Sequence, residues 1–581
     1  MMDRGMILRV LLERGTERFA DRVFLKYKAQ GRVENETFKT FFDSVCRWSS
    51  FLIEHGVREG DRVAVVSDKS SVQVRLMYAV WMLGAVAVPV CEVLGHDEMR
   101  FVIDDCDPKL IIVQDKHTDK YRQAFGERVC FNFYEIMAYA EQLETCPRVP
   151  PLKQCGIDDV AALIYTSGST GMPKGVMLSH RNLSVNAQSA VNGIGLTGND
   201  LCFSILPYWH SFALTVEVIM PMLAGFTVGY ANDRRDFLKS MTIYNPTVIL
   251  GVPRVFETVR SGILKEVSKQ PPMVQKLFKY ALRNSVKVQG AYSKGGCAGW
   301  ARRKLHKGSD YFFFRKIRKR FGSQLRFFVG GGAPLDVDYQ HFFKGLGIPI
   351  FQGYGLTEAS PVISANCSGA HKLGSSGRIF DWLHGDAGGD YTFLTDDGVR
   401  GKGLEGELLV KGDCVMKGYW RHADESAKTL DDGWLHTGDV AYVDEEGFLF
   451  ISGRKGNMIV LLGGEKLHPE HVEDALKHSD YISEVMVIGE GLKNVYACVN
   501  VPEEKRNAHS EEELTAVLKK EIQKHCAHLA VFQRPKAAVC LPDFNIEDGT
   551  LTATLKVRRY KVKERDRLLI DSFLSSCGES I

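Results

Sequence analysis

The sequence predicts an α/β fold: a large N-terminal domain of parallel-rich sheets with helices, including a β subdomain, and a small α+β C-terminal domain. Three observations predict it. The 581 residues exceed what a single hydrophobic core usually supports. Short β-branched or apolar runs alternate with amphipathic stretches over most of the chain. Near residue 381 the pattern changes to short runs separated by Gly- and Asp-rich turns.

The composition is that of an ordinary folded protein. Hydrophobic residues make up 45% and charged residues 25% of the chain. The formal net charge of +3 is too small to indicate a nucleic-acid partner for the chain as a whole. Fourteen cysteines are scattered without CxxC pairs. They indicate reduced thiols in a cytosolic compartment, and we expect no disulfides.

The N-terminal domain begins with two recognisable elements. MMDRGMILRVLLERG interleaves charged and apolar residues, which predicts a short amphipathic helix rather than a secretory signal. The longest apolar run, Leu76 to Cys91, contains Gly84 and Pro89. It is short for a membrane span, so we expect a core helix that leads into a strand.

Buried strands of the parallel sheets follow along the chain. They are predicted at RVAVVS (near Val63), KLIIVQ (near Ile111), VAALIYTS (near Leu163), PTVILGV (near Val248) and LRFFVGGG (near Phe327). The turn-rich stretch after them predicts an antiparallel β subdomain over about residues 380–450.

A domain boundary is expected at Gly456. The sequence there reads as a hairpin from Asp444, a glycine-bearing break, a strand, and a helix that begins at Pro469. The strand pair VMVIGEGLKNVYACVNV and the helix EEELTAVLKKEIQKHC suffice for a small α+β domain. The predicted domains are therefore 1–455 and 456–581.

The strongest chemical signal is YTSGSTGMPKG, Tyr165 to Gly175, directly after a predicted strand. Small residues let the backbone curl so that N–H groups and hydroxyls point at phosphate oxygens, and Lys174 adds positive charge. The pattern predicts a phosphate-binding loop. It differs from the P-loop motif, because the order is Pro-Lys-Gly rather than Gly-Lys-Ser.

Four further segments follow in order: GGGAPL at Gly330, GYGLTE at Gly353, GWLHTGD at Gly433 and ISGRKGNMIV at Ile451. With the first loop they resemble the adenylate-forming (AMP-binding) superfamily, most closely its long-chain fatty acyl-CoA synthetases. The resemblance runs from about Asp21 to about Lys563. It implies activation of a carboxylic acid as acyl-AMP with release of pyrophosphate, then transfer of the acyl group to a thiol.

The resemblance implies a role for each motif. The first loop would hold the β- and γ-phosphates of ATP through Thr166, Ser167, Gly168, Ser169, Thr170, Gly171 and the catalytic Lys174. Gly332 and Ala333 would line the adenine pocket with backbone. In GYGLTE, the motif's Gly355 also contributes to nucleotide binding. Tyr354 would contact the adenine, Thr357 the α-phosphate and Glu358 Mg²⁺.

Three further roles come from the same resemblance. Asp439 in HTGD would accept hydrogen bonds from both ribose hydroxyls, and Arg454 in SGRKG would also reach the ribose. Lys556 in LTATLKVRR matches a late catalytic lysine that bridges the acyl carboxylate and the α-phosphate. The C-terminal domain would be mobile and swing about Gly456, where relatives usually carry Asp or Lys.

The class of the carboxylic acid substrate is inferred from LPYWHSFAL, Leu206 to Leu214. By the resemblance, this segment matches the acyl-pocket motif, with His210 at its recurrent histidine. The motif contains no acidic residue, which disfavours an amino-acid substrate. The stretch from Ser309 to Leu335 is most similar to long-chain acyl-CoA synthetases. Within it, Phe314, Ile317 and Phe321 share a helical face among basic residues. That face either contacts an anionic bilayer over 311–321 or covers the protein's own surface.

We therefore predict an ATP-dependent, AMP-forming acid–thiol ligase: a long-chain fatty acid:CoA ligase that uses ATP, Mg²⁺ and coenzyme A. A fatty acid:acyl carrier protein ligase or a fatty acyl-AMP ligase on the same fold remains the alternative, and a relative that binds without turnover is a third. Fatty acid and CoA or a carrier protein are the expected partners, with no nucleic acid. The expected location is cytoplasmic, with peripheral contact to the inner face of the membrane left open.

Overall fold

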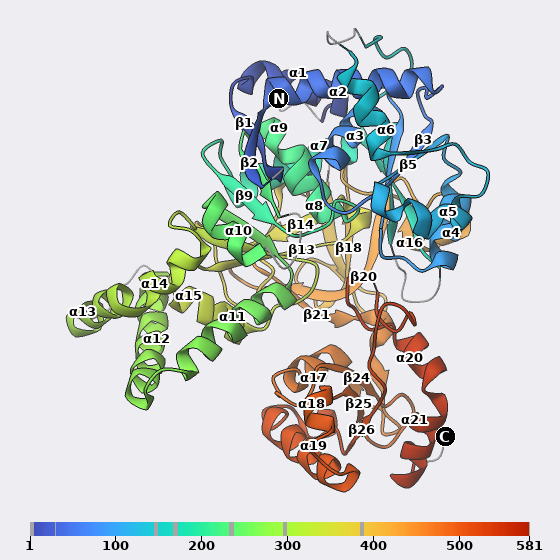
Figure 1. Ribbon diagram of the computed structural model, residues 1–581. Helices are drawn as coiled ribbons and strands as arrows, with labels where there is room; N and C mark the ends of the chain where they lie inside the picture. Colours follow the sequence, from blue (N-terminus) through green and yellow to red (C-terminus); the bar gives the residue numbers. More distant parts are fainter. Residues whose placement is uncertain are drawn as a thin grey trace.

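Two mostly parallel sheets form the centre of the large domain (Figure 1). The computed structural model describes residues 5–29, 31–143, 149–166, 172–231, 237–293, 299–383, 389–552 and 554–579. The nine-stranded sheet has the order β15-β14-β13-β12-β11-β9-β10-β1-β2, and the six-stranded sheet the order β6-β5-β3-β4-β7-β8.

The strands of the nine-stranded sheet are β1 Val23–Ala29, β2 Arg32–Thr37, β9 Leu201–Ser204, β10 Thr227–Tyr230, β11 Val248–Gly251, β12 Phe327–Gly330, β13 Ile350–Gly355, β14 Val362–Ala365 and β15 Arg378–Ile379. Those of the six-stranded sheet are β3 Arg62–Val66, β4 Val86–Val90, β5 Leu110–Val113, β6 Cys130–Asn132, β7 Val160–Thr166 and β8 Lys174–Ser179. The pairs β3–β5 and β11–β12 are parallel, as predicted, whereas β7 pairs antiparallel with β8.

Helices cover both sheets. In the large domain they are α1 Leu8–Phe19, α2 Phe38–Glu54, α3 Ser71–Met82, α4 His96–Cys106, α5 Thr118–Phe125, α6 Phe133–Glu141, α7 His180–Ile194, α8 Ser211–Ala213, α9 Met220–Ala224, α10 Phe237–Tyr244, α11 Pro253–Ser268, α12 Pro272–Ser293, α13 Trp300–Ser309, α14 Arg315–Arg318, α15 Val337–Gly345 and α16 Ala423–Thr429. A π-helix, η2 Leu214–Ile219, follows α8. The predicted N-terminal helix is α1, and the longest apolar run, Leu76 to Cys91, forms the end of α3 and all of β4 and is buried throughout.

The predicted β subdomain is a six-stranded antiparallel sheet that extends to Arg454. Its strands are β16 Asp390–Leu394, β17 Arg400–Gly401, β18 Gly406–Lys411, β19 Leu430–Asp431, β20 Trp434–Val443 and β21 Leu449–Arg454. A 3-10 turn, η9 Lys455–Asn457, follows β21 and contains Gly456.

The smaller C-terminal domain has its own core. Its strands are β22 Ile459–Val460, β23 Lys466–Leu467, β24 Glu484–Ile488, β25 Tyr496–Asn500 and β26 Ala538–Cys540, and its helices are α17 Pro469–Leu476, α18 Glu503–Arg506, α19 Glu511–His525, α20 Arg559–Arg565 and α21 Arg567–Ser576. Apolar residues of α17 and α19 pack on one face of the β24-β25-β26 sheet, and those of α20 and α21 on the other. The helix predicted to begin at Pro469 does so.

Charged pairs join the two domains. They are Arg254–Glu484 at 2.5 Å, Lys466–Asp396 at 2.8 Å, Arg558–Glu98 at 2.8 Å and His478–Asp336 at 3.5 Å. Polar, partly exposed contacts of this kind are typical of domains that move relative to one another.

The predicted apolar face of Phe314, Ile317 and Phe321 packs against the core of the large domain. Asp310–Phe314 is a π-helical turn, α14 follows, and Lys319–Phe321 is a 3-10 turn. Phe314 is 0% and Phe321 3% exposed, and both rings pack into the core, Phe321 at 5.7 Å from Phe328. The face of Phe314 and Phe321 therefore covers the protein's own interior, whereas Tyr311 and Phe312 beside it are exposed. Among the described helices, none has both the length and the apolar character needed to cross a membrane.

Candidate active site

A cleft lies where the β7–β8 hairpin, the end of β13 and the β subdomain meet. It is lined by Thr166, Lys174, Leu356, Glu358, Glu407, Tyr419, Lys428, Thr429, His436, Thr437, Gly438 and Arg454. Segments nearly 300 residues apart in sequence therefore contribute to one cavity. A second hollow, lined in part by Lys26, Asn199 and Asn245, contains no residue of the five motifs.

Tyr354, Asp439 and Arg454 form a cluster at the cleft, here called the Asp439 cluster. Asp439 and Arg454 are direct partners across β20 and β21. Arg454 Nε lies 2.9 Å from Asp439 Oδ1, and the Tyr354 hydroxyl, from β13, donates to Oδ2 at 2.7 Å. Burial, together with the nearby carboxylate, raises the pKa of Tyr354, so its hydroxyl stays protonated and donates. The buried carboxylate is thus held from two sides.

Glu358 and Thr357 lie beside this cluster, just after β13. The Tyr419 hydroxyl donates to Glu358 Oε1 at 2.9 Å. The hydroxyls of Thr357 and Ser211 are 3.0 Å apart, which connects GYGLTE to the helical turn after His210. One Glu358 oxygen is thus oriented by a tyrosine, and the second suits a hard cation such as Mg²⁺.

Lys174 begins β8 and points toward α16. Its ammonium lies 2.5 Å from Glu425 Oε2 and 5.3 Å from the centre of the Tyr419 ring. Lys174, followed by Lys428, lowers the pKa of Glu425 to about 2. Glu425 is therefore ionised at neutral pH and holds the lysine at the cleft wall.

Lys556 reaches the same cleft from the C-terminal domain. Its pKa is lowered, first by desolvation and then by the charge of Arg454, while Asp439 and Glu358 partly oppose the shift. These three charged groups therefore lie near enough to the ammonium to act on it. The side chain as a whole is exposed.

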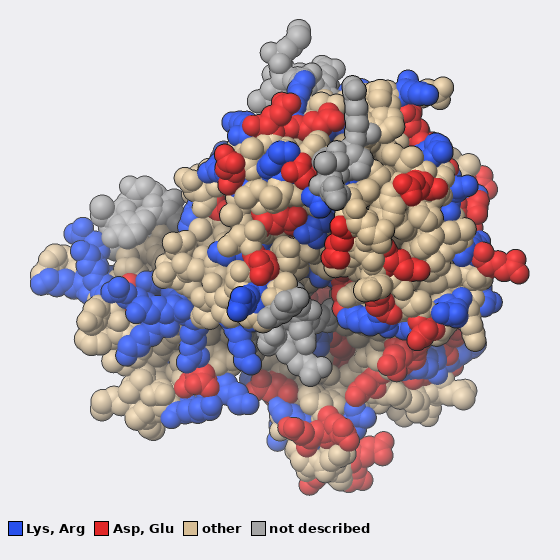
Figure 2. All heavy atoms as spheres, turned by 45° about the horizontal axis from the view of Figure 1, so that its top comes forward, with Lys and Arg blue, Asp and Glu red and all other residues tan. Residues whose placement is uncertain are grey.

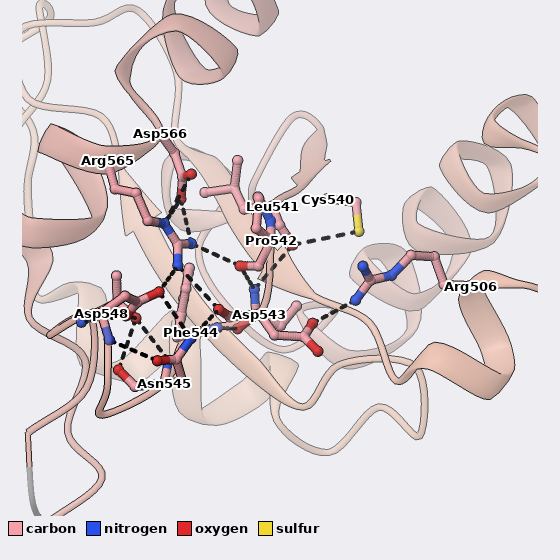
Figure 3. Close-up of polar contacts among 12 residues, drawn as sticks. Arg506, Cys540, Leu541, Pro542, Asp543, Phe544, Asn545, Asp548, Arg565 and Asp566 are labelled. Atoms are coloured by element: carbon pink, nitrogen blue, oxygen red, sulfur yellow. Dashed lines mark hydrogen bonds and ion pairs between the residues drawn. The ribbon is translucent and has the colours of Figure 1, made fainter.

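The loop that carries Lys556, Thr554 to Arg558, is tightly anchored at its base. Leu555 has a left-handed backbone, φ +62°, and the Lys556 amide donates to Thr552 Oγ1 at 3.0 Å. Nearby, Arg565 donates to the carbonyl oxygens of Pro542 and Asp543 (Figure 3). The Thr552 contact holds the loop within its own domain, and the Arg565 contacts hold the neighbouring segment at Pro542 and Asp543.

One contact fixes the loop to the large domain. Arg558, which is 7% exposed, donates to Glu98 Oε1 at 2.8 Å, in the first turn of α4. Two residues thus separate Lys556 from an ion pair that crosses the domain interface. We call this pair the Arg558–Glu98 bridge.

His210 faces the site from the acyl motif. It caps α8, and its Nδ1 accepts a hydrogen bond from the Phe212 amide at 3.2 Å. Burial, with a further contribution from Lys556, lowers the pKa of His210 to about 4. The ring is therefore neutral at pH 7 and, since Nδ1 accepts, carries its proton on Nε2.

Comparison with known proteins identifies the family of this chain. The family model for the AMP-binding enzyme matches residues 12–420, and the model for the AMP-binding enzyme C-terminal domain matches residues 456–564. The chain belongs to the AMP-binding enzyme family.

Relatives within the family are ligases. A long-chain-fatty-acid–CoA ligase, FadD15 of Mycobacterium bovis, is 30% identical over 551 residues, which is 88% of each chain. A long-chain-fatty-acid–[acyl-carrier-protein] ligase, chloroplastic AEE15 of Arabidopsis thaliana, is 30% identical over 466 residues, 72% of this chain and 62% of the relative. This AMP-binding enzyme is accordingly an AMP-forming ligase.

Solved structures of the family share its fold. ATP-bound MatB from Rhodopseudomonas palustris aligns with a TM-score of 0.72 at 23% identity, covering 97% of this chain and 99% of the other. The anthranilate CoA ligase AuaEII in complex with anthranoyl-AMP aligns with a TM-score of 0.75 at 21% identity, covering 97% and 98%.

Of the sequence-predicted residues of this AMP-binding enzyme, Thr166, Lys174, Glu358 and Arg454 line the cleft, and Asp439 and Tyr354 are joined to Arg454 beside it. Five others, Ser167, Gly168, Ser169, Thr170 and Gly171, lie outside the described residues. Gly355 is required by its surroundings, because a Cβ there would lie 1.8 Å from the Pro361 carbonyl oxygen. Gly332 has φ +83°, and the next carbonyl, of Ala333, accepts from Gln352 at 3.1 Å.

Sequence reasoning missed several residues that hold the predicted ones. They are Glu98, Ser211, Tyr419, Glu425 and Arg558. Tyr419 lies 61 positions from Glu358, and Glu425 lies 251 from Lys174. The tyrosine directly follows a glycine of φ +130°, Gly418, which is the one local signal that marked this turn.

Proposed function

We propose that this enzyme is a long-chain fatty acid:CoA ligase that works in two steps. The observation that carries the proposal is the cleft lined by Lys174, Glu358 and Arg454, with Asp439 paired to Arg454 and Lys556 of the C-terminal domain within the electrostatic influence of these groups. Cations from two domains and a carboxylate suited to Mg²⁺ thus meet at one place. Such an arrangement suits a reaction that brings a triphosphate and a carboxylate together.

In the first step, a carboxylate oxygen attacks the α-phosphorus of ATP and pyrophosphate leaves. Lys556 would bridge the carboxylate and the α-phosphate, and Thr357 would donate to the α-phosphate. Asp439, held by Tyr354 and Arg454, would accept from the ribose hydroxyls. Glu358 would hold Mg²⁺, which neutralises phosphate charge when bound.

Lys174 would exchange partners when ATP binds. Its ammonium now pairs with Glu425. In the sequence, the first loop, which carries Ser167 to Gly171, leads directly into β8, the strand that begins at Lys174. Triphosphate oxygens carry more charge than one carboxylate, so they would displace Glu425. The pair with Glu425 would keep the lysine at the cleft wall between turnovers.

In the second step, the CoA thiol loses its proton, the sulfur attacks the acyl carbonyl, and AMP leaves. Domain 456–581 would turn about Gly456 to admit the thiol. A Cβ at Gly456 would meet no atom within 4 Å, and its φ is not positive. This orientation therefore does not require glycine, which supports a role for its freedom in another orientation.

A fatty acid is the substrate we infer, from the long-chain ligase relatives and the acid-free acyl motif around His210. The Arabidopsis relative favours one alternative acceptor, an acyl carrier protein. We also propose that the enzyme is cytoplasmic.

The test uses purified enzyme with ATP, Mg²⁺ and palmitate. Palmitate-dependent exchange of pyrophosphate into ATP should appear without any thiol, and added CoA should release AMP and yield palmitoyl-CoA. Exchange without CoA turnover, but with turnover on holo acyl carrier protein, would establish the alternative. Absence of exchange across a chain-length panel, or release of ADP, would refute adenylation.

A further inference from the structure

Three helices, α12, α13 and α14, project from one side of the large domain (Figure 1). The inward face of α12 is anchored: Phe278 and Ala281 are buried, and Ser285 Oγ donates to the Gly345 carbonyl at 2.7 Å. Asn284 Nδ2 donates to the Arg302 carbonyl at 3.1 Å, which holds α13 against α12. The opposite faces of these helices are free to meet a partner.

This projection carries a concentrated positive charge. Between Pro272 and Phe321 the chain has fourteen Lys or Arg residues and one acidic residue, Asp310, whereas the whole chain has a net charge of only +3. Arg318 pairs with Asp310 at 2.6 Å, so that acid neutralises none of the other cations. The rest of the chain is therefore net acidic.

The cations lie on the outside. The exposed ones are Lys276, Lys279, Arg283, Lys287, Arg302, Arg303, Lys304, Lys307, Arg315, Lys316, Lys319 and Arg320. Figure 2 shows Lys and Arg gathered over this projecting side, on the left. Of these twelve, only Arg320 has an ion pair among the described residues, with Glu266 at 3.9 Å. Like charges this crowded repel one another, and an anionic partner would relieve that repulsion.

Bulky apolar side chains stand among these cations. They are Met273, Leu277, Tyr280, Trp300, Tyr311 and Phe312, exposed by 81, 48, 61, 65, 64 and 63%. Isolated exposed apolar residues are ordinary, but a group interleaved with twelve cations marks an interaction surface. We call this set of exposed cations and apolar residues the basic surface.

Helical spacing puts both kinds of side chain on the same face. Trp300, Lys304, Lys307 and Tyr311 are spaced i, i+4, i+7 and i+11, so they follow one side of α13 and the turn after it. Lys304 Nζ lies 4.2 Å from the centre of the Trp300 ring. On α12, Met273, Leu277 and Tyr280 repeat the i, i+4, i+7 spacing.

We propose that the basic surface docks this enzyme on an anionic lipid bilayer. Lysine and arginine would pair with acidic headgroups, while Trp, Tyr and Phe rings settle at the level of the headgroups. A nucleic acid would satisfy the cations, but it would gain little from aliphatic Met273 and Leu277, which a bilayer buries. The proposal concerns a surface outside the cleft, so it holds independently of which acid the enzyme activates.

The test measures flotation of the full chain with vesicles of phosphatidylcholine alone and with about 30% phosphatidylglycerol. One variant removes four cations of the basic surface: Arg302→Gln, Arg303→Gln, Lys304→Gln and Lys307→Gln. A second removes two rings, Trp300→Ala and Tyr311→Ala. The matched control removes four exposed cations elsewhere: Lys519→Gln, Lys520→Gln, Lys524→Gln and Arg567→Gln.

We expect the natural sequence to bind only the anionic vesicles, and less at high salt. The four-cation variant should partition about ten-fold less or worse, the two-ring variant should also lose binding, and the control should stay within about two-fold. Equal partition of the four-cation variant and the control would overturn the proposal. Indifference to phosphatidylglycerol, or tighter binding to poly-uridine RNA than to the vesicles, would do so too.

Acid-dependent pyrophosphate exchange, run on every variant with a short soluble acid, shows whether the cleft is folded. We expect it unchanged in all of them, because no substituted residue lines the cleft. Loss of exchange from the natural sequence itself would refute the proposed function and leave the vesicle result standing.

Discussion

Tyr354, Asp439 and Arg454 come from the large domain alone, whereas Lys556 reaches the same cleft from the small domain. In the Asp439 cluster, Asp439 and Arg454 stand on adjacent, register-matched strands and Tyr354 on β13, and both carboxylate oxygens are occupied, at 2.7 and 2.9 Å. Lys556 depends instead on a loop whose link to the large domain, close to the lysine, is the Arg558–Glu98 bridge.

The Asp439 cluster and the Lys556 loop are therefore held in place in different ways. Asp439 and Arg454 are fixed by paired strands of the β subdomain, and Tyr354 joins them from β13, so no residue of the cluster comes from the small domain. The Lys556 loop is in place only while the domain interface holds, and that interface rests largely on charged pairs. Under the proposed function, the nucleotide-binding groups would be preorganised, and Lys556, proposed to act on the reacting atoms, would be removable.

Replacing the removable group should have the largest effect. We expect Lys556→Ala to lower the rate of acyl-AMP formation about 10²- to 10³-fold, because a cation between two anions is lost. Thioester formation from supplied acyl-AMP should change little. Single-turnover assays of the two half-reactions measure this, with Lys563→Ala as the matched control. Equal loss in both halves would show that Lys556 is not specific to the first.

The preorganised cluster should respond differently. Asp439→Asn removes a charge-assisted acceptor from Tyr354 and Arg454, and we expect the KM for ATP to rise about 10- to 100-fold. Since the cluster would serve the nucleotide in both orientations, both half-reactions should weaken. An effect restricted to one half-reaction would contradict the comparison.

Breaking the Arg558–Glu98 bridge should have a smaller effect than Lys556→Ala or Asp439→Asn. Glu98→Gln leaves a largely buried arginine without its charged partner, so we expect acyl-AMP formation to fall about ten-fold and thioester formation to persist. The reversed pair, Glu98→Arg with Arg558→Glu, should recover part of the loss. Without such recovery, Arg558 would act through something other than Glu98. Glu127→Gln, an exposed change, is the control.

A small change at the hinge sharpens the comparison further. Gly456→Ala fits the present orientation, because a Cβ there meets no atom within 4 Å. We expect acyl-AMP formation to stay within experimental error and thioester formation to slow about two- to five-fold, as φ/ψ freedom is lost. Slower acyl-AMP formation alone would argue against a hinge at this residue.

The smallest effect concerns pH. Asp336, across the interface, raises the pKa of His478 above its ordinary value. The pair is therefore fully present below about pH 6.5 and is lost as the pH rises through the raised pKa. Between about pH 6 and pH 8.5 the present orientation should weaken by up to about 1 kcal/mol. The measurement is the ratio of the rates of the two half-reactions as a function of pH. Asp336→Asn should make this ratio depend less on pH over that range, and an unchanged dependence would exclude the pair as its cause.

The sequence by itself determined the local part of this protein. The alternating runs predicted the buried parallel strands, Pro469 predicted the start of α17, and four of the five motifs contribute residues to the cleft. These features depend on spacing within a few residues, because backbone geometry and burial determine which residue types occur at which local positions.

Tertiary structure alone decided which side chains meet. Nothing near Glu98 in the sequence points to Arg558, 460 positions later, and nothing near Lys174 points to Glu425. The face of Phe314 and Phe321 shows the same limit: its periodicity was right, but only packing against Phe328 and its neighbours shows that it points inward. Periodicity defines a face, whereas long-range packing decides what that face contacts.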